Sequence, residues 1–330
     1  MSELFEERNH VKRYSNIDVV EFLTKKHRKR YAEYRAEWDA AMNGKAVPQA
    51  PLSFFMELVS YCNLKCKMCV RNYDSDGKKK RQALPLEIID NVTQQFKSLN
   101  IPSVEYGGGA SECLLHPEIK TIIRKFKEAG AIDNIITTNG HKLSEDISTF
   151  LIDIGVERLH VSIDAATNET YKKVRGADYS ILEKNIFNFL RLRKERKSQL
   201  PFLRVSFVKQ KDNIHEVNAF FNKWKDVADY IDFQDFLDLS NVDTLRQVNC
   251  EGFYCPVPFQ KIGIDYEGNI LPCDPFHSRH LILGNIKNMS LKEAWNSDKY
   301  QKLRESHLLK SNFLVCQNCY GNRTYVLLET

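Results

Sequence analysis

The segment Cys62-Asn63-Leu64-Lys65-Cys66-Lys67-Met68-Cys69 directly follows the apolar run Phe54–Val59, which has the length of a buried strand. Its spacing is Cys-x3-Cys-x2-Cys, and no fourth Cys or His stands close by. A structural zinc site uses four ligands in two pairs. Three thiolates on a cubane iron–sulfur cluster instead leave one iron open to another ligand. Half of a zinc site and three incidental cysteines are the alternatives.

Outward from this loop, short apolar or β-branched runs alternate with amphipathic segments. The predicted strands are Phe54–Val59, Ser103–Tyr106, Asn134–Thr137, Arg158–Ile163, Phe202–Val208 and Tyr230–Phe236, and the helices lie near Leu86–Leu99, Glu118–Ala129, Ser144–Ile154, Ile181–Arg193 and Ile214–Trp224. Such alternation implies right-handed crossovers and a parallel sheet. The β/α units fit either an open sheet or a partial barrel, and in both folds ligands gather at the carboxyl ends of the strands.

The composition narrows the class of protein. With 330 residues, 42% of them hydrophobic, the chain is long enough for a large globular domain and a smaller appendage. A net charge of +5 is too mild to indicate nucleic acid binding. No apolar stretch approaches the ~20 residues of a membrane span, and no signal peptide is visible, so we expect a cytoplasmic protein that binds no membrane. In a reducing compartment, nine cysteines indicate metal ligands or catalytic thiols.

A second group of cysteines lies about 190 residues after the first. Gly268 marks a hairpin turn that brings Cys255 and Cys273 near one another, and Cys316 and Cys319 follow later. Four thiolates can close a tetrahedral zinc site or bind all four corners of a second cubane. The sequence leaves both possibilities open.

The three-cysteine loop after the first strand of the β/α alternation resembles that of the radical S-adenosylmethionine (SAM) superfamily. The resemblance implies a partial (β/α)6 barrel, with a [4Fe–4S] cluster on Cys62, Cys66 and Cys69. It further implies that SAM chelates the open iron and is cleaved to a 5′-deoxyadenosyl radical, which abstracts a hydrogen atom. Met68 stands where the family usually has an aromatic residue.

The same resemblance assigns residues to SAM. The glycine-rich stretch from Tyr106 to Pro117 resembles the motif that holds the methionine amino group, although Cys113 replaces its usual proline. Ser162 and Asp164, expected on one face of a strand, would offer a hydroxyl and a carboxylate. Ordinary turn chemistry is the alternative for the glycines and for Asn139. The residues assigned to SAM are Gly108, Gly109, Glu112, Asn139, Ser162, Asp164 and Arg175.

The C-terminal region resembles the auxiliary-cluster extension called SPASM or twitch. A full SPASM domain has more cysteines than the five of this tail, so the resemblance implies one auxiliary [4Fe–4S] cluster, on Cys255, Cys273, Cys316 and Cys319. Cys113 and Cys250 remain. A free cysteine is most often a small buried hydrophobe, but Cys250 is also a candidate cluster ligand or hydrogen-atom donor to a substrate radical.

We therefore expect a helical extension over residues 1–50, a radical SAM partial barrel over 51–240 and a small cysteine-rich α+β iron–sulfur domain over 241–330. The predicted reaction is dehydrogenation or epimerisation of a small polar substrate, a sugar or an aminocyclitol, with a flavodoxin or ferredoxin as electron donor. A peptide substrate is the alternative, disfavoured because the first 50 residues are short for a leader-binding domain. A non-enzymatic zinc or nucleic-acid module on the C-terminal cysteines would leave Cys62, Cys66 and Cys69 unexplained.

Overall fold

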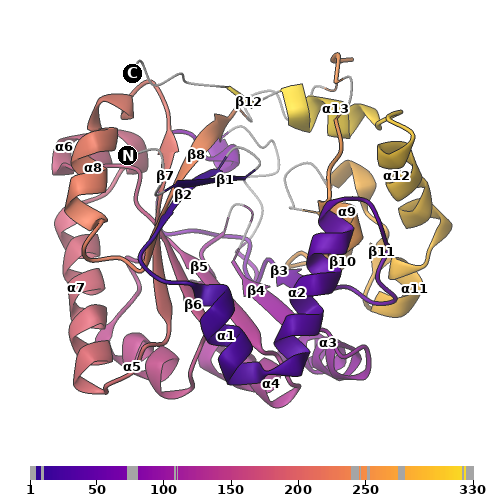
Figure 1. Cartoon of the computed structure of the whole chain (residues 1–330), viewed down its shortest axis with the longest axis horizontal. Coiled ribbons are helices and arrows are strands. Elements are labelled where there is room, and N and C mark those ends of the chain that lie inside the picture. Colours follow the sequence, from indigo (N-terminus) through magenta and orange to yellow (C-terminus); the bar gives the residue numbers. More distant parts are fainter. Residues whose placement is uncertain are drawn as a thin grey trace.

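The structure of the chain is a computed structural model that describes residues 5–8, 11–72, 81–107, 109, 111–238, 245, 247–250, 253–273, 279–321 and 323–324. Its curved sheet carries helices on the outside and elements from both ends of the chain at its two edges (Figure 1). Among the described residues, no helix has the length and apolar character that crossing a membrane requires.

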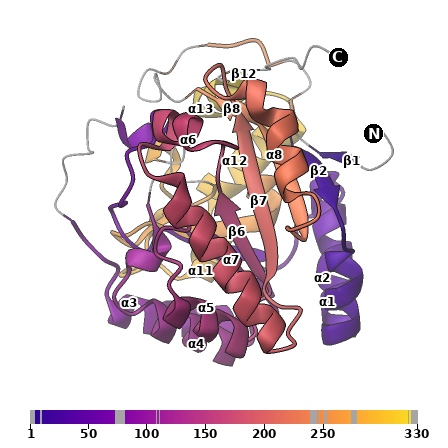
Figure 2. The ribbon, with the colours of Figure 1, turned by 90° about the vertical axis from the view of Figure 1, so that its left-hand side faces the viewer.

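The centre of the sheet is six parallel strands joined by helices. The strands are β3 (Ser53–Met56), β4 (Ser103–Tyr106), β5 (Asp133–Thr138), β6 (Arg158–Ser162), β7 (Phe202–Lys209) and β8 (Tyr230–Leu237). They lie side by side in chain order. The helices are α3 (Leu86–Ser98), α4 (Ile119–Glu128), α5 (Glu145–Asp153), α6 (Asn168–Arg175), α7 (Tyr179–Glu195) and α8 (Val217–Trp224), and Figure 2 shows α7 on the outer face of the sheet. This architecture confirms the predicted partial barrel.

Apolar spacing and local caps explain these helices. In α4 the buried residues Ile119, Ile122, Ile123 and Phe126 recur at helical spacing, so one face of the helix packs on the sheet. The ring of Phe126 stacks on Phe54 of β3, with the ring centroids 6.2 Å apart. Burial of these side chains ties α4 to the sheet.

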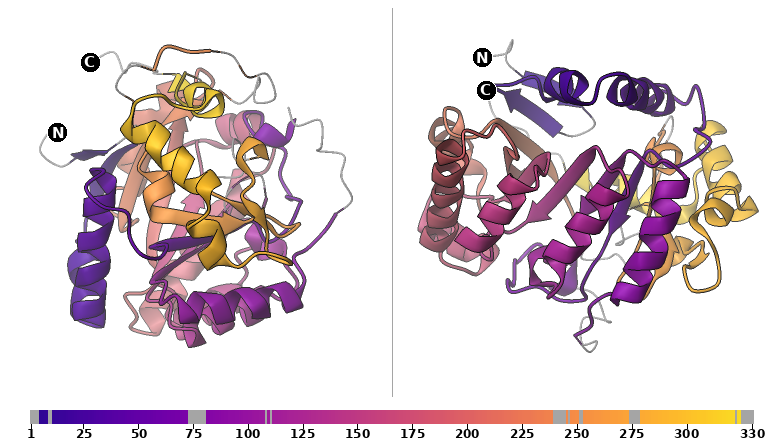
Figure 3. Two further views of the ribbon diagram at one scale, coloured as in Figure 1. Left: turned by 90° about the vertical axis from the view of Figure 1, so that its right-hand side faces the viewer. Right: turned by 90° about the horizontal axis from the view of Figure 1, so that it is seen from below.

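The N-terminal segment differs from the predicted helical extension. It contains the helices α1 (Val19–His27) and α2 (Lys29–Met42), but it begins with the hairpin β1 (Phe5–Arg8) and β2 (Val11–Ser15). Strand β2 pairs antiparallel with β8, and Arg13 donates two hydrogen bonds, 2.6 and 2.7 Å long, to the carboxylate of Asp232. Seen from below, α1 and α2 lie on the opposite side of the sheet from α3 and α4 (Figure 3). The adjacent basic residues Lys12 and Arg13 in the middle of Val11–Ser15 break the apolar pattern by which a strand is recognised in the sequence.

The C-terminal segment extends the other edge of the sheet. Its elements are α9 (Val257–Gln260), β9 (Lys261–Ile264), β10 (Asn269–Leu271), β11 (Gly284–Asn285), α11 (Leu291–Trp295), α12 (Asp298–Leu308), α13 (Leu314–Gly321) and β12 (Arg323–Thr324). Strand β9 pairs parallel with β3, and β10 and β11 follow in antiparallel order. Strand β12 pairs with β8. The predicted hairpin is confirmed, and the C-terminal cysteines are held against the open side of the barrel.

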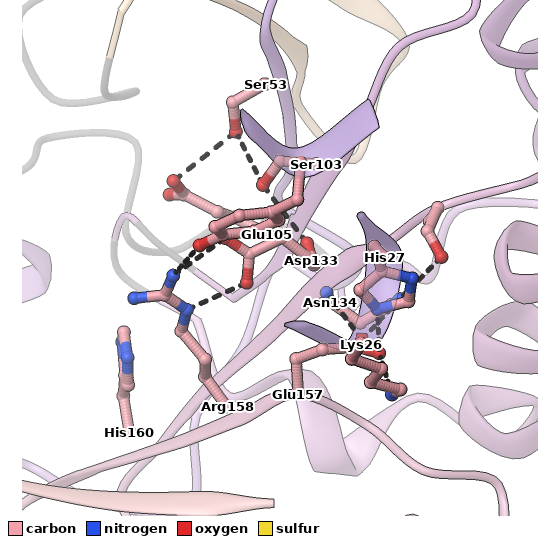
Figure 4. A network of polar contacts seen from close by, with 12 residues as sticks. Lys26, His27, Ser53, Ser103, Glu105, Asp133, Asn134, Glu157, Arg158 and His160 are labelled. Atoms are coloured by element: carbon pink, nitrogen blue, oxygen red, sulfur yellow. Dashed lines mark hydrogen bonds and ion pairs between the residues drawn. The ribbon is translucent and has the colours of Figure 1, made fainter. Parts of the chain in front are cut away.

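A polar network joins α1 to the amino ends of the central strands (Figure 4). Glu157, just before β6, is fully buried and accepts hydrogen bonds from Lys26 (2.9 Å), Lys127 (2.8 Å) and the backbone amide of Asn134 (3.0 Å). Burial by itself would raise the pKa of Glu157, but His27, Lys127 and Lys26 together lower it to about 2. The folded chain therefore holds this carboxylate in its charged form.

Replacing Glu157 by glutamine is expected to lower the free energy of unfolding at pH 7 by about 3 kcal/mol, from the pKa difference between about 4.5 unfolded and about 2 folded. Because the folded pKa is the lower one, the stabilisation is present above the unfolded pKa. It is lost as the pH falls from about 4.5 towards 2. Urea unfolding at pH 7 and at pH 3 would measure it. The exposed Glu21→Gln is the control, and an equal loss in both variants at pH 7 would contradict the argument.

Candidate active site

The first cysteine loop lies at the carboxyl end of β3, where ligands of such sheets bind. Cys66 is buried, and Cys62 and Cys69 are half-buried. The amide of Lys67 donates to the carbonyl of Val174 in α6 (2.9 Å). The ammonium of Lys67 also pairs with Asp212, 2.7 Å away. These contacts hold the loop against α6 and against the segment after β7.

Two residues that the sequence assigned to SAM contact the cysteine thiols. Asn139, after β5, donates to Cys62 Sγ at 3.5 Å, and Arg175, at the end of α6, donates to Cys66 Sγ at 3.6 Å. Arg175 Nε is buried and has no hydrogen-bond partner among the described residues, so it can donate to a further acceptor. Three thiols beside a buried guanidinium fit an iron–sulfur cluster with an anionic ligand.

Burial keeps the thiols of Cys62 and Cys69 protonated unless a metal binds them. It raises the pKa of Cys62 to about 11 and also raises the pKa of Cys69. Nearby Glu112 adds to the shift at Cys62. Metal binding supplies the positive charge that releases such protons.

The expected shared strand face of Ser162 and Asp164 is wrong. Strand β6 ends at Ser162, which is half-buried, and Asp164 has a left-handed φ of 66°. The carboxylate of Asp164 accepts a hydrogen bond from the amide of Val208 (2.8 Å) and forms an ion pair with Arg175. Asp164 therefore orients Arg175, and a positive φ could not be anticipated from a predicted strand.

Glu112 supports the loop that carries Asn139. Its carboxylate is almost fully buried and accepts hydrogen bonds from Thr138 Oγ1 (2.7 Å), the amide of Asn139 (2.7 Å) and the amide of Leu114 (3.2 Å). Burial raises the pKa of Glu112, and these donors oppose that rise. Both carboxylate oxygens of Glu112 therefore accept hydrogen bonds from the protein itself.

The glycine-rich stretch is only partly visible. Gly107 has φ 81°, and a Cβ there would lie 2.4 Å from the carbonyl oxygen of Thr137, so only glycine fits. Gly109 has φ 67°, whereas Gly108 lies outside the described residues. Cys113 is fully buried and donates to the carbonyl of Thr137 (3.3 Å), as expected of a structural cysteine.

The structure brings the second cysteine group together, including Cys255 and Cys273, the pair that the hairpin was expected to bring near one another. Cys255 precedes α9, Cys273 follows β10, and Cys316 and Cys319 lie on α13. All four line one cavity of about 460 Å³. Burial raises the pKa of Cys316, and the neighbouring Cys255 and Cys319 raise it further.

The same cavity reaches into the barrel. Its wall includes Met68 of the first cysteine loop together with Glu105 of β4 and Asp235 of β8. Glu105 pairs with Lys261 at 2.5 Å, and Asp235 pairs with Lys209 at 2.7 Å. Sequence reasoning missed these charges. The available signal was a charged residue inside an apolar strand, such as Glu105 in Ser103–Tyr106, which must face either solvent or a ligand.

Cys250 lies beside the second cysteine group. Its Sγ accepts a weak hydrogen bond from Asn312 at 3.8 Å, and it adds to the pKa rise of Cys316. Among the described residues that line the cavity, Cys250 does not appear. It therefore lies near Cys316 without being part of the described cavity wall.

No group of three or more His, Cys, Asp or Glu side chains within the described ranges is arranged to hold a metal ion. A cubane separates its ligands more widely than one zinc ion does, because each thiolate binds a different iron. The donor sets, three thiols and four thiols, match the chemistry of iron–sulfur clusters.

Comparisons with known proteins agree with these two sites. Residues 56–205 match the radical SAM superfamily, and residues 255–320 match SPASM, an iron–sulfur cluster-binding domain. The chain is 23% identical over 315 residues to the tungsten-containing aldehyde ferredoxin oxidoreductase cofactor-modifying protein of Pyrococcus furiosus, covering 80% of this chain and 86% of the relative.

Solved structures share the fold. The structure of BtrN in complex with AdoMet and 2-DOIA aligns with a TM-score of 0.55 and 19% identity, over 85% of this chain and 95% of BtrN. The structure of Streptococcus suis SuiB bound to precursor peptide SuiA aligns with a TM-score of 0.58 and 18% identity, over 91% of this chain and 74% of SuiB.

Proposed function

The chain belongs to the radical SAM superfamily and carries a SPASM domain, and from this we propose that it dehydrogenates a small polar substrate such as a sugar or an aminocyclitol. The observation that carries the proposal is a cavity lined both by Met68 of the first cysteine loop and by the four C-terminal cysteines. When bound, the two [4Fe–4S] clusters and SAM supply hydrogen-atom abstraction and one-electron transfer.

The protein's own residues hold these groups and the substrate. Cys62, Cys66 and Cys69 are the proposed ligands of the SAM-binding cluster. Arg175, oriented by Asp164, would bind the carboxylate of SAM, and Asn139 lies beside Cys62. Ser162, Gly108 and Gly109 remain proposed SAM contacts.

The charged residues of the cavity wall suit a substrate alcohol that is oxidised to a carbonyl. That oxidation removes one hydrogen atom, one electron and one proton from the substrate. Glu105 and Asp235 are carboxylates in the cavity wall, and we assign the proton to one of them. Each is paired with a lysine, which can in turn donate a hydrogen bond to a substrate hydroxyl.

Dehydrogenation is favoured over epimerisation by the position of Cys250. An epimerase needs a hydrogen-atom donor that faces the substrate radical, whereas Cys250 is not among the described residues that line the cavity. A peptide is the second candidate substrate, since SuiB, which has a similar fold, binds a precursor peptide. The 460 Å³ cavity must hold a cluster as well as the substrate, which favours a small molecule.

Deuterium transfer would test the substrate class. Anaerobic chain, SAM and a flavodoxin or ferredoxin-type donor would be supplied with ring-deuterated aminocyclitols and sugars. We expect one of them to give 5′-deoxyadenosine that is one mass unit heavier, together with a product three mass units lighter than the labelled substrate, which has lost one deuterium and one hydrogen. Transfer from peptides alone would replace this proposal by the second candidate, and a product of inverted configuration one mass unit lighter than the labelled substrate would indicate epimerisation.

A further inference from the structure

His307 is a buried polar side chain that the proposed reaction does not use. It lies on α12 and is only 1% exposed. Neither ring nitrogen meets a described partner with full hydrogen-bond geometry, although the side chain of Asn312 lies close enough to raise the pKa of His307 against the effect of burial. Asn312 can serve one ring nitrogen only. Leaving the other nitrogen unsatisfied costs about 1–3 kcal/mol, so it requires a partner besides Asn312.

The position of His307 identifies that partner. Leu303 and His307, one helical turn apart, both line the cavity that Cys255, Cys273, Cys316 and Cys319 also line. The ring of Phe253 packs edge-on against the imidazole, with the centroids 5.9 Å apart, and limits its rotation. The imidazole of His307 thus lines the space that the auxiliary cluster would occupy.

We propose that His307 donates a hydrogen bond to a sulfur of the auxiliary cluster and thereby raises the reduction potential of that cluster. Four cysteines already supply a ligand for each iron, so the imidazole has no vacant iron to bind. A hydrogen bond to a cluster sulfur stabilises the reduced form, which is more negative. The inference rests on the ligand set of four cysteines given above.

Its consequence is a cluster that accepts an electron from the substrate radical more readily. Both neighbouring pairs of charges, Glu105–Lys261 and Asp235–Lys209, are internally neutralised. His307 is then the uncharged donor that favours reduction without adding a charge to the cavity. This role differs from that of Arg175, whose guanidinium faces the other cysteine loop.

The test measures the potential of the auxiliary cluster by itself. The full chain with Cys62, Cys66 and Cys69 replaced by alanine serves as the parent, so that one cluster gives the whole EPR signal. In this parent, His307→Phe keeps an aromatic ring and removes the hydrogen-bond donor. We expect the reduction equilibrium of the cluster to shift at least tenfold towards the oxidised form, which corresponds to ~59 mV for one electron. His307→Gln retains a donor and is expected to recover part of the shift.

Controls separate this role from simple packing. Tyr254→Phe removes a hydroxyl that donates to the carbonyl of Ala41 beside the same ring, and it should leave the potential unchanged. An unchanged potential in His307→Phe, with about four irons still bound, would overturn the proposal. A parent that binds no cluster would instead refute the four-cysteine ligand set.

Pulsed EPR of the parent labelled with 15N-histidine keeps the test informative if His307→Phe fails to fold. A weak nitrogen coupling supports the hydrogen bond. A strong coupling would identify His307 as an iron ligand, and the absence of any coupling would leave the cluster without this donor. Either of the last two results overturns the proposal.

Discussion

Replacing Cys62, Cys66 and Cys69 together by alanine is expected to abolish 5′-deoxyadenosine formation under dithionite and to lower the iron content from about eight to about four per chain. The reason is that these three thiols are the proposed ligands of the one cluster with an open iron. Iron and sulfide assays and chromatography of the nucleoside product measure both effects.

Cys113→Ala is the matched control for that experiment. Cys113 is buried near the same loop, but it belongs to neither cysteine group. It should keep about eight irons and full SAM cleavage. Survival of 5′-deoxyadenosine formation in the triple variant would show that another part of the chain holds SAM.

Replacing Cys316 and Cys319 by alanine is expected to separate SAM cleavage from product formation. The variant should lose about four irons, because a cubane cannot persist on two thiolates, yet it should still release 5′-deoxyadenosine. Substrate oxidation should stop, since the electron has no acceptor. The measurements are metal analysis, EPR in the presence of SAM, and product analysis.

The same variant decides between iron and zinc in the C-terminal site. A zinc protein would contain about four irons and one zinc before the change, and it would lose only the zinc. Chain that is isolated anaerobically with zinc and without a second cluster would contradict the auxiliary ligand set while leaving the first site intact.

Much of the fold could be predicted from the sequence because local pattern and global fold agree in the barrel. The six central strands were located to within a few residues, since each is a short apolar run and the runs alternate with amphipathic helices. Helix α6 was missed because Asn168–Arg175 is mostly polar, with only Thr170, Tyr171 and Val174 buried.

The candidate site was less predictable because its geometry depends on contacts between distant residues. Cysteine spacing identified both cysteine groups, but nothing local indicates that β2 pairs with β8 or that Asp164 turns away from β6 to meet Arg175. His307 had no signal either. Its importance follows from how α12 packs beside four cysteines that come from separate segments of the chain.

The pairing of β2 with β8 has a consequence for synthesis on the ribosome. Arg13 and Asp232 are 219 positions apart, so the hairpin at the start of the chain has no partner until most of the barrel has emerged. Strand β3 likewise gains its outer neighbour only when β9 appears. Contacts of such long range slow folding. Both edges of the nascent half-barrel are therefore exposed to other chains during translation, and cellular chaperones would be needed most in that interval.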